Sequence, residues 1–237
     1  MELFYCDTIE YGKAWLDEQE SVHCIRVLRH KVDDDLIFTD GKGKKYFSKI
    51  EIAHAKKCEL RIVRVIEEKP RDFFLHIAIA PTKAIDRFEW FLEKATELGV
   101  EEITPLLTRY TERKHLNYQR CEKILISAMK QSNRLYLPKL NEMITYQKFL
   151  DKDFSGTKAI AHCEPLERKS LNAILSNAKS LMVLIGPEGD FSKEEIVLAM
   201  SKKFESVTLG DKRLRTETAA VHVCSAPGFL NNTGLSS

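Results

Sequence analysis

The chain has 237 residues, 43% hydrophobic and 30% charged, enough for one large or two modest domains with a proper core. Its 37 basic and 35 acidic side chains leave a formal net charge of only +2, so any surface that binds nucleic acid must come from local clustering. Its apolar runs are far shorter than the roughly 18 residues of a membrane-spanning helix, and its N-terminus lacks the pattern of a signal peptide. The six cysteines form no CxxC pair and the seven histidines no HxxxH pair, so reduced thiols in a cytosolic protein without a metal site are expected.

Residues 1–70 predict a small β-rich domain. Between Leu60 and Val65, apolar residues alternate with arginines, which is the period-two pattern of a half-buried strand. A charged segment that contains Pro70 follows and predicts a linker over residues 67–72. The strands predicted in this part of the chain are 36–39, 46–53 and 60–65. The stretch 23–30 is helix-like.

Residues 71–237 predict an α/β domain, because strand and helix patterns alternate along them. Phe73 to Ala80 is almost wholly apolar, as in a strand covered on both faces. Gly99 is a suitable stop for a preceding helix, and Ser192 with Glu195 forms a capping box at the start of another. This alternation predicts a mostly parallel sheet covered by helices. The predicted strands are 73–80, 103–107, 158–163, 181–185 and 207–209, and the predicted helices are 83–98, 117–132, 170–178, 192–203 and 217–230.

Two loops are candidates for a ligand site, because open α/β sheets bind ligands beyond the carboxyl ends of their strands. The first loop is 185–190, with the sequence IGPEGD. Gly186 and Gly189 let the backbone approach a ligand closely, and Pro187 stiffens the turn. The loop has neither the dinucleotide-binding glycine pattern nor a P-loop, and an ordinary strand-to-helix turn would have the same composition.

The second loop, 209–218, joins the next strand to the last helix. Three of its residues are basic, namely Lys212, Arg213 and Arg215. Thr216 is placed to cap the helix, and Glu217 in the first turn suits the helix dipole. A capped surface loop would explain these residues too. Together the two loops offer backbone amides, a carboxylate and guanidinium groups, which suits a small polar cofactor beside a polyanion.

Local basic clusters favour RNA as that polyanion. Residues 41–61 hold seven basic and two acidic side chains, and residues 109–139 hold eight basic and two acidic ones. The stretch 23–30 adds a third cluster. Such patches bind phosphates, although a run of charge is also common on any solvated face. Three clusters in a nearly neutral chain favour the RNA interpretation.

Five motifs, in the right order and spread over almost the whole chain, resemble those of the RsmE family. These are bacterial enzymes that methylate N3 of one uridine in the RNA of the small ribosomal subunit. The chain departs from the family pattern at Asp190, where a third glycine is usual, at Arg213, where an apolar residue is common, and in the segment 108–114. The motifs are HCIRVLR at 23–29, EKATELGV with ITPL at 93–106, MKQSNR with LP at 129–138, LIGPEG at 184–189 and LRTETA at 214–219.

The resemblance implies a PUA-like β-barrel that binds RNA at 1–70 and a SPOUT-type methyltransferase domain with a C-terminal trefoil knot at 71–237. It also implies a homodimer that acts on 16S rRNA or the assembled small subunit, with S-adenosylmethionine as cofactor and no membrane partner. The implied cofactor contacts are Leu184, Ile185, Gly186, Pro187, Glu188, Gly189, Leu209, Gly210, Leu214, Arg215, Thr216, Thr218 and Ala219. The implied RNA contacts are His23, Arg26, Arg29, Lys44, Lys45, Arg113, Gln131 and Arg134.

The expected chemistry needs an unpaired or flipped-out uridine, because N3 lies on the Watson–Crick edge and carries a proton. A cation near O2 or O4 would stabilise the base as that proton leaves, and Arg215 is the best candidate. Glu217 is a candidate base, but a role at the helix start suits it equally well. Two alternatives stay open: another SPOUT methyltransferase that acts on a ribose 2′-hydroxyl or a different base, and an RNA-binding protein without catalytic activity.

Overall fold

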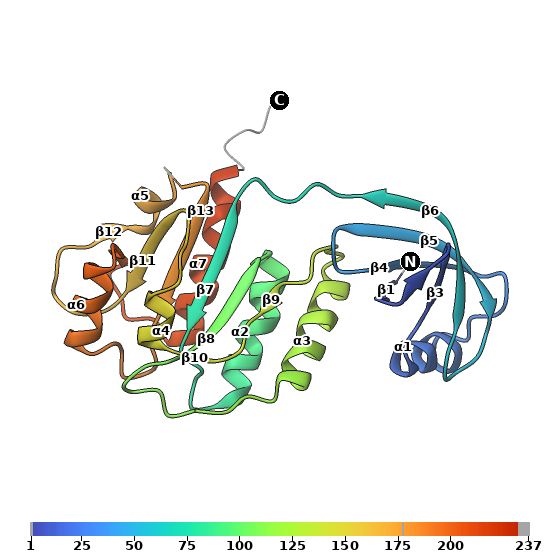
Figure 1. Cartoon of the computed structure of the whole chain (residues 1–237), viewed down its shortest axis with the longest axis horizontal. Helices are drawn as coiled ribbons and strands as arrows, with labels where there is room; N and C mark the ends of the chain where they lie inside the picture. The colour runs from blue at the N-terminus through green and yellow to red at the C-terminus, as the bar shows by residue number, and fades with distance from the viewer. Residues whose placement is uncertain (1, 177, 232–237) are drawn as a thin grey trace. The chain divides into compact units, whose positions relative to one another are not determined.

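The computed structural model describes residues 2–176 and 178–231 and divides into two compact units. The first unit comprises residues 1–70 and 126–137, and the second comprises residues 71–125 and 138–237. Figure 1 shows the elements of both units coloured along the chain. The sequence did not indicate that residues 126–137, which follow the predicted linker, belong with the N-terminal residues.

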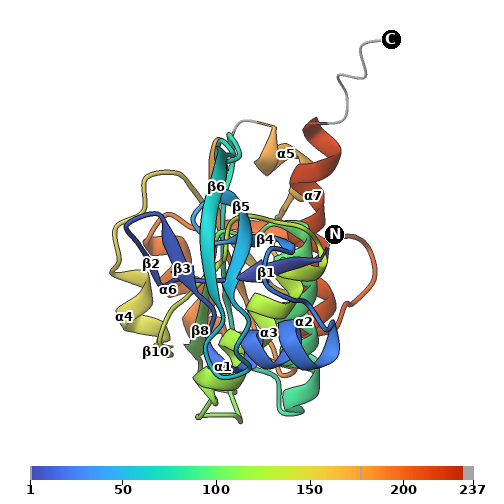
Figure 2. The same ribbon diagram turned by 90° about the vertical axis from the view of Figure 1, so that its right-hand side faces the viewer.

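The first unit is built on a curled six-stranded sheet of order β1-β4-β5-β6-β3-β2, in which β1 runs parallel to β4 and the other pairs are antiparallel. Figure 2 shows the two long strands β5 and β6 side by side. The three predicted strands are confirmed as β4, β5 and β6, whereas the short strands β1 to β3 were missed. The bounds are β1 Leu3–Tyr5, β2 Ile9–Glu10, β3 Lys13–Trp15, β4 Asp35–Thr39, β5 Lys44–Ile52 and β6 Glu59–Glu67.

The helix-like stretch 23–30 is confirmed only in part. A short helix α1 (Glu18–Val22), capped by the Asp17 side chain, runs into a π-helical turn η1 (His23–Val27). The turn ends where the N–H of His30 bonds to the Cys24 carbonyl, with Arg29 between them at φ +61°. Non-glycine residues rarely adopt this left-handed conformation.

Residues 126–137 complete the first unit at the turn between β4 and β5. The Gly43 N–H donates to the Leu135 carbonyl at 2.8 Å, and the Leu137 N–H donates to the Gly41 carbonyl at 2.8 Å. A Cβ on Gly43 would lie 2.3 Å from the Tyr136 ring, so only glycine fits there. These contacts explain why a segment distant in sequence belongs to the N-terminal unit.

The second unit is built on a sheet of order β10-β8-β7-β13-β11-β14-β12, with β9 beside β8, and every neighbouring pair is parallel. The five predicted strands are confirmed as β7, β8, β11, β13 and β14. The missed strands β9, β10 and β12 have two residues each. The bounds are β7 Phe74–Ile79, β8 Glu102–Leu107, β9 Lys139–Leu140, β10 Ile144–Thr145, β11 Thr157–Ala161, β12 Lys169–Ser170, β13 Ser180–Ile185 and β14 Glu205–Thr208.

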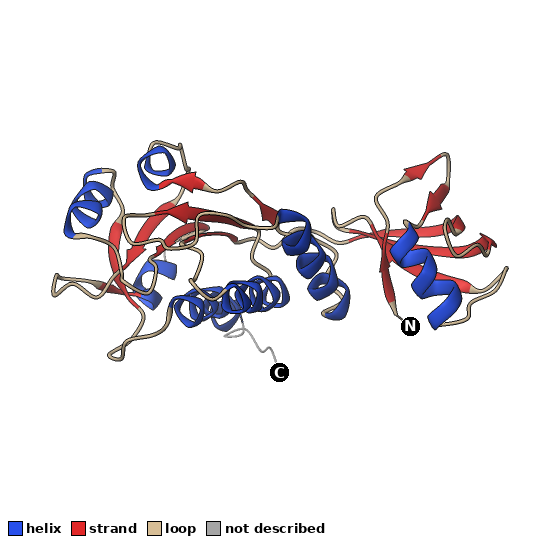
Figure 3. Cartoon of the chain, turned by 90° about the horizontal axis from the view of Figure 1, so that it is seen from below, coloured by secondary structure: helices blue, strands red, loops and turns tan. Residues whose placement is uncertain are grey.

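Helices cover both faces of this sheet, as Figure 3 shows. The predicted long helices are confirmed, Gly99 ends α2 at φ +81°, and the Ser192–Glu195 capping box is present at α6. The helix predicted at 170–178 is only five residues long, and α4 was missed. No described helix is long and apolar enough to cross a bilayer. The bounds are α2 Ile85–Leu98, α3 Tyr118–Gln131, α4 Tyr146–Leu150, α5 Leu171–Leu175, α6 Lys193–Ser201 and α7 Thr216–Asn231.

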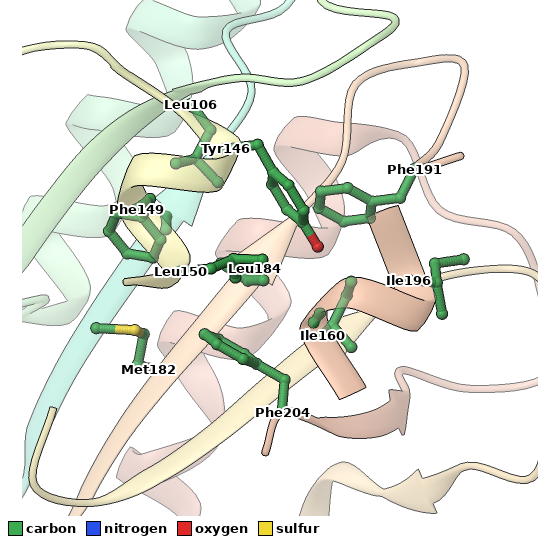
Figure 4. Packing of buried hydrophobic residues seen from close by; sticks show 12 residues of the cluster. Leu106, Tyr146, Phe149, Leu150, Ile160, Met182, Leu184, Phe191, Ile196 and Phe204 are labelled. Carbon is green, nitrogen blue, oxygen red and sulfur yellow. The ribbon is translucent and has the colours of Figure 1, made fainter. Parts of the chain in front are cut away.

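One hydrophobic cluster joins α4 and α6 to the sheet, and Figure 4 shows its members from close by. The rings of Tyr146 and Phe191 pack with their centroids 5.5 Å apart. The Tyr146 hydroxyl donates to the Glu195 carbonyl at 2.8 Å. Fully burying each large apolar side chain stabilises the fold by about 1.5–3 kcal/mol. The cluster therefore holds the start of α6, and the loop after β13, against the sheet.

Candidate cofactor and RNA site

A pocket of about 320 Å³ lies at the carboxyl ends of three adjacent strands of the second unit. This is the edge at which α/β sheets bind ligands. Both loops singled out in the sequence contribute to the pocket, and the end of β11 supplies a third side. The lining residues are 161–163 and 168 at and after the end of β11, 185–188 and 190 at and after the end of β13, and 207–210, 212–216 and 219 at and after the end of β14.

The two predicted loops are tied together by direct hydrogen bonds. The Thr216 hydroxyl donates to the Gly186 carbonyl at 3.0 Å, and the Arg213 guanidinium donates to the Glu188 carbonyl at 3.1 Å. The expectation that Thr216 caps α7 is wrong. The first helical turn closes on the Arg215 carbonyl, which accepts from the Ala219 N–H at 2.8 Å. The Thr216 side chain links the loops instead.

Asp190 ties the glycine loop to the third side of the pocket. Its carboxylate accepts hydrogen bonds from the Cys163 N–H at 2.8 Å and from the Phe191 N–H at 2.7 Å. Its own N–H closes the turn on the Pro187 carbonyl at 2.9 Å. Asp190 has φ +65°, a conformation that glycine adopts without strain. Asp190 stands where the family usually has a third glycine. Its carboxylate clamps the glycine loop to the end of β11 through these hydrogen bonds, which a glycine could not make.

Both glycines of the first loop lie close to aromatic side chains of the protein. A Cβ on Gly186 would lie 3.1 Å from the Phe191 ring, and a Cβ on Gly189 would lie 3.2 Å from Cβ of Tyr110. Neither glycine has a positive φ, and Gly189 does not line the pocket. In the second loop Gly210 does line the pocket, at φ +129° with open space around it. Gly189 therefore lies against Tyr110 rather than in the pocket lining, and its contact with a ligand stays a prediction.

Most of the residues proposed for the cofactor are brought together. Three of them lie away from the pocket: Leu184 is buried in the sheet, Gly189 faces Tyr110, and Thr218 is exposed on α7. Sequence reasoning missed the residues at the end of β11, although the rule that ligands bind at strand ends would have indicated them, and it gave no role to Asp190 of the candidate loop. The proposed residues that line the pocket are Ile185, Gly186, Pro187, Glu188, Leu209, Gly210, Leu214, Arg215, Thr216 and Ala219.

The two proposed catalytic residues lie in different environments. Arg215 is exposed at the pocket, and no carboxylate pairs with it in the part of the chain that the structure describes. Glu217 is only 7% exposed and is not among the pocket-lining residues. One of its carboxylate oxygens is buried without a hydrogen-bond partner among the described residues. The geometry favours Arg215 as the residue that meets a ligand in the pocket.

His162 forms the buried wall of the pocket at the end of β11. Its Nε2 lies 3.0 Å from the Ser206 hydroxyl, and its carbonyl accepts from the Arg168 guanidinium at 2.8 Å. Burial lowers the pKa of His162 below its usual value. The ring is therefore neutral at pH 7, and the positive charge of the pocket comes from its arginines and from Lys212. No described group of three or more metal-ligating side chains occurs in the chain.

Seven of the eight residues proposed for RNA binding belong to the first unit. Arg26 and Arg29 are exposed at the π-helical turn. Lys44 and Lys45 are neighbours on β5, so their side chains point to opposite faces of the strand and do not form one patch. Arg113 belongs to the second unit and donates to the carbonyls of Thr82 and Lys83, at 3.1 and 2.6 Å. The remaining proposed residues of the first unit are His23, Gln131 and Arg134.

Family models match both parts of the chain. An RNA methyltransferase domain matches residues 67–227, and an RNA methyltransferase PUA domain matches residues 16–63. Together with the parallel sheet and the pocket at its carboxyl edge, these matches identify the chain as an RNA methyltransferase.

Relatives and solved structures agree over nearly the whole chain. A Rickettsia conorii protein named ribosomal RNA small subunit methyltransferase E is 31% identical, over 90% of this chain and 88% of its own. The crystal structure of a probable rRNA methyltransferase from Porphyromonas gingivalis matches with a TM-score of 0.89 and 35% identity, over 98% of this chain and 99% of its own. A methyltransferase E from Neisseria gonorrhoeae, solved with S-adenosyl methionine bound, matches with a TM-score of 0.86 and 27% identity, over 97% of this chain and 98% of its own. The chain belongs to the family of ribosomal RNA small subunit methyltransferase E.

Proposed function

We propose that the protein transfers a methyl group from S-adenosylmethionine to N3 of one uridine in 16S ribosomal RNA. The observation that carries this proposal is the pocket at the carboxyl ends of β11, β13 and β14. A member of the same family has been solved with that cofactor bound. A substrate of this kind implies action in the cytoplasm, where ribosomal subunits are assembled.

The residues of the pocket fit such a cofactor. Leu209, Leu214 and Ala219 offer apolar contacts for a nucleoside ring, and Gly186 and Gly210 line the pocket beside them. Apolar walls with a few fixed polar groups are typical of sites for small ligands. The open space at Gly210 leaves room that a side chain would fill. When bound, the cofactor supplies an electrophilic methyl group.

The chain itself must position the uridine and stabilise the charge that develops on it. Loss of the N3 proton spreads negative charge over O2 and O4 of the base. Arg215 is exposed at the pocket, keeps its charge at any working pH and presents a planar set of donors. A fixed cation of this kind acts without reorganising, so it stabilises the transition state more than the ground state.

The resemblance adds a C-terminal trefoil knot, a closed barrel in the first unit and a homodimer to this proposal. The hydrogen bond from Thr216 to Gly186 fixes the start of α7 against the loop after β13. RNA binding is assigned to the basic residues of the first unit, such as Arg26 and Arg29. Light scattering of the purified protein measures the dimer directly, and a monomer at micromolar concentration would contradict it.

Product analysis tests the proposed function. Mass-spectrometric mapping of nucleosides in ribosomal RNA from cells that lack the protein should show one 3-methyluridine missing from 16S rRNA. Loss of a 2′-O-methyl group or of another methylated base would favour a different SPOUT methyltransferase. Calorimetric titration with S-adenosylmethionine, with and without a chelator, should give the same affinity. Absence of binding in both would favour a non-catalytic RNA-binding protein.

A further inference from the structure

An exposed tyrosine lies beside the glycine loop of the pocket. Tyr110 follows β8 and is 47% exposed. A Cβ on Gly189 would lie 3.2 Å from Cβ and 3.5 Å from Cγ of Tyr110. Gly189 does not line the pocket, whereas its neighbours Glu188 and Asp190 do. Tyr110 therefore lies against the loop 185–190, which forms one side of the pocket.

Hydrogen bonds of the residues before and after Tyr110 fix the turn that carries it. The Thr108 N–H donates to the Thr111 hydroxyl at 2.9 Å. The Arg109 N–H donates to the Glu195 carboxylate at 2.8 Å, and Glu195 is buried in the capping box of α6. The turn is thus held by its own backbone and by α6. It keeps its shape without the exposed part of the Tyr110 ring.

An arginine side chain packs over one face of the ring. The Arg109 guanidinium carbon lies over the Tyr110 ring, 5.6 Å from its centroid, and the same guanidinium donates to Glu194 at 3.2 Å. A partly exposed aromatic ring with an arginine packed against it is a combination that binds unpaired nucleobases next to a phosphate. A base taken out of its stack for reaction needs such a surface.

We propose that Tyr110 stacks on a nucleobase of the RNA substrate at the mouth of the pocket, with Arg109 beside it. The proposal rests on the proposed function and adds a substrate-binding residue to it. Uridine has a π face but stacks weakly on its own, so an aromatic surface compensates for the stacking lost on leaving the RNA. The turn after β8 is then part of the RNA site, although it departs from the family's sequence pattern.

Three substitutions separate stacking from packing. Tyr110→Phe keeps the ring, Tyr110→Leu keeps apolar bulk against Gly189 without an aromatic face, and Tyr110→Ala removes both. We expect the KM for RNA, and the Kd for a single-stranded fragment around the target, to rise about 5- to 100-fold in the Leu and Ala variants. The Phe variant should match the wild type. The Kd for S-adenosylmethionine should not change in the Phe and Leu variants.

Two further variants sharpen the test. Gly189→Ala places a methyl group against Tyr110, which must shift by a few tenths of an ångström, so RNA affinity should fall. Tyr11→Ala removes an equally polar ring from the tip of the β2–β3 hairpin, where it is fully exposed, and serves as the matched control. Equal RNA affinity in Tyr110→Leu and the wild type would overturn the proposal, as would a loss of cofactor affinity as large as the loss of RNA affinity.

Wild-type methyl transfer in the same assay tests the proposed function separately. If the wild type methylates another nucleotide, the proposed function fails while the RNA affinities of the Tyr110 variants still decide the stacking contact. If the wild type binds no RNA, both proposals fall.

Discussion

The carboxylate of Asp190 accepts a hydrogen bond from the backbone N–H of Cys163 at 2.8 Å, which joins the loop after β13 to the end of β11. The same residue has φ +65°, and a left-handed conformation costs an L-residue about 1–2 kcal/mol. Aspartate is among the residues that tolerate this conformation best. At this position the chain combines a strained backbone with a clamp that a third glycine would lack.

Substitutions at Asp190 should separate the clamp from the strain. Asp190→Ala loses both hydrogen bonds and keeps the strain, whereas Asp190→Gly loses the bonds and relieves the strain. We expect the Ala variant to be less stable than the Gly variant by about 1 kcal/mol, as measured by urea denaturation. Both should bind S-adenosylmethionine more weakly, as measured by calorimetric titration. Wild-type cofactor affinity in both variants would show that the clamp does not shape the pocket.

Arg215 should determine the rate of methyl transfer. Removing one preorganised electrostatic donor typically lowers the rate about 100- to 1000-fold, so Arg215→Ala should fall in that range under single-turnover conditions with saturating RNA and cofactor. Arg215→Lys keeps the charge without the planar donors and should lie between Ala and wild type. Lys202→Ala, at the end of α6 and paired with Asp151, is the charge-matched control. A wild-type rate in Arg215→Ala would remove it from the mechanism.

Arg29 should show opposite effects on stability and on RNA binding. At φ +61°, Arg29→Gly relieves backbone strain and should raise the free energy of unfolding by up to about 1 kcal/mol. The same change removes a cation from the basic turn, so RNA affinity should fall and depend less on salt. Lys203→Gly is the matched control, because it relieves the same strain, at φ +66°, and removes one positive charge from the second unit, after α6. If the two variants bind RNA equally well, Arg29 makes no phosphate contact.

His76 should make the second unit sensitive to acid. Burial lowers its pKa to about 4, and its Nε2 lies 2.7 Å from the Thr104 hydroxyl. Between pH 6.5 and 4 the unfolded chain binds a proton that the folded chain excludes. Stability is therefore fully present above pH 6.5 and falls as the pH drops towards 4, by up to about 3 kcal/mol. His76→Gln should flatten this part of the profile in urea denaturation at a series of pH values, and an unchanged slope would contradict the assignment.

The sequence predicted the parts of the fold that have strong, regular patterns. β7 is an apolar run and α2 has apolar residues at helical spacing with a glycine stop, so both were found. The two-residue strands and α4 are too short to show a period. The π-helical turn has no hydrophobic repeat of its own. That residues 126–137 belong to the first unit depends on pairings such as Gly43 with Leu135, which no local pattern contains.

The site was predicted in outline from the rule that ligands bind at strand ends. That rule placed the two loops together, and the hydrogen bond from Thr216 to Gly186 bears out their proximity. It could not indicate what each residue does there. Thr216 fits a helix cap by composition, and Gly189 fits a ligand-binding turn. Only the three-dimensional arrangement reveals that the first links the loops and that the second makes room for Tyr110.

The composition of the first unit has a consequence for how the protein is made. When the ribosome has synthesised residues 1–70, the turn between β4 and β5 still lacks two hydrogen-bond partners. The Leu135 carbonyl accepts from the Gly43 N–H, and the Leu137 N–H donates to the Gly41 carbonyl. These partners emerge only after a further stretch of the second unit has been translated. A nascent chain halted near residue 70 should therefore expose this turn to proteases, and one halted beyond residue 137, once clear of the exit tunnel, should protect it. The β4–β5 turn of the N-terminal unit is thus completed by a segment from the middle of the chain, which is synthesised much later than the strands that it joins.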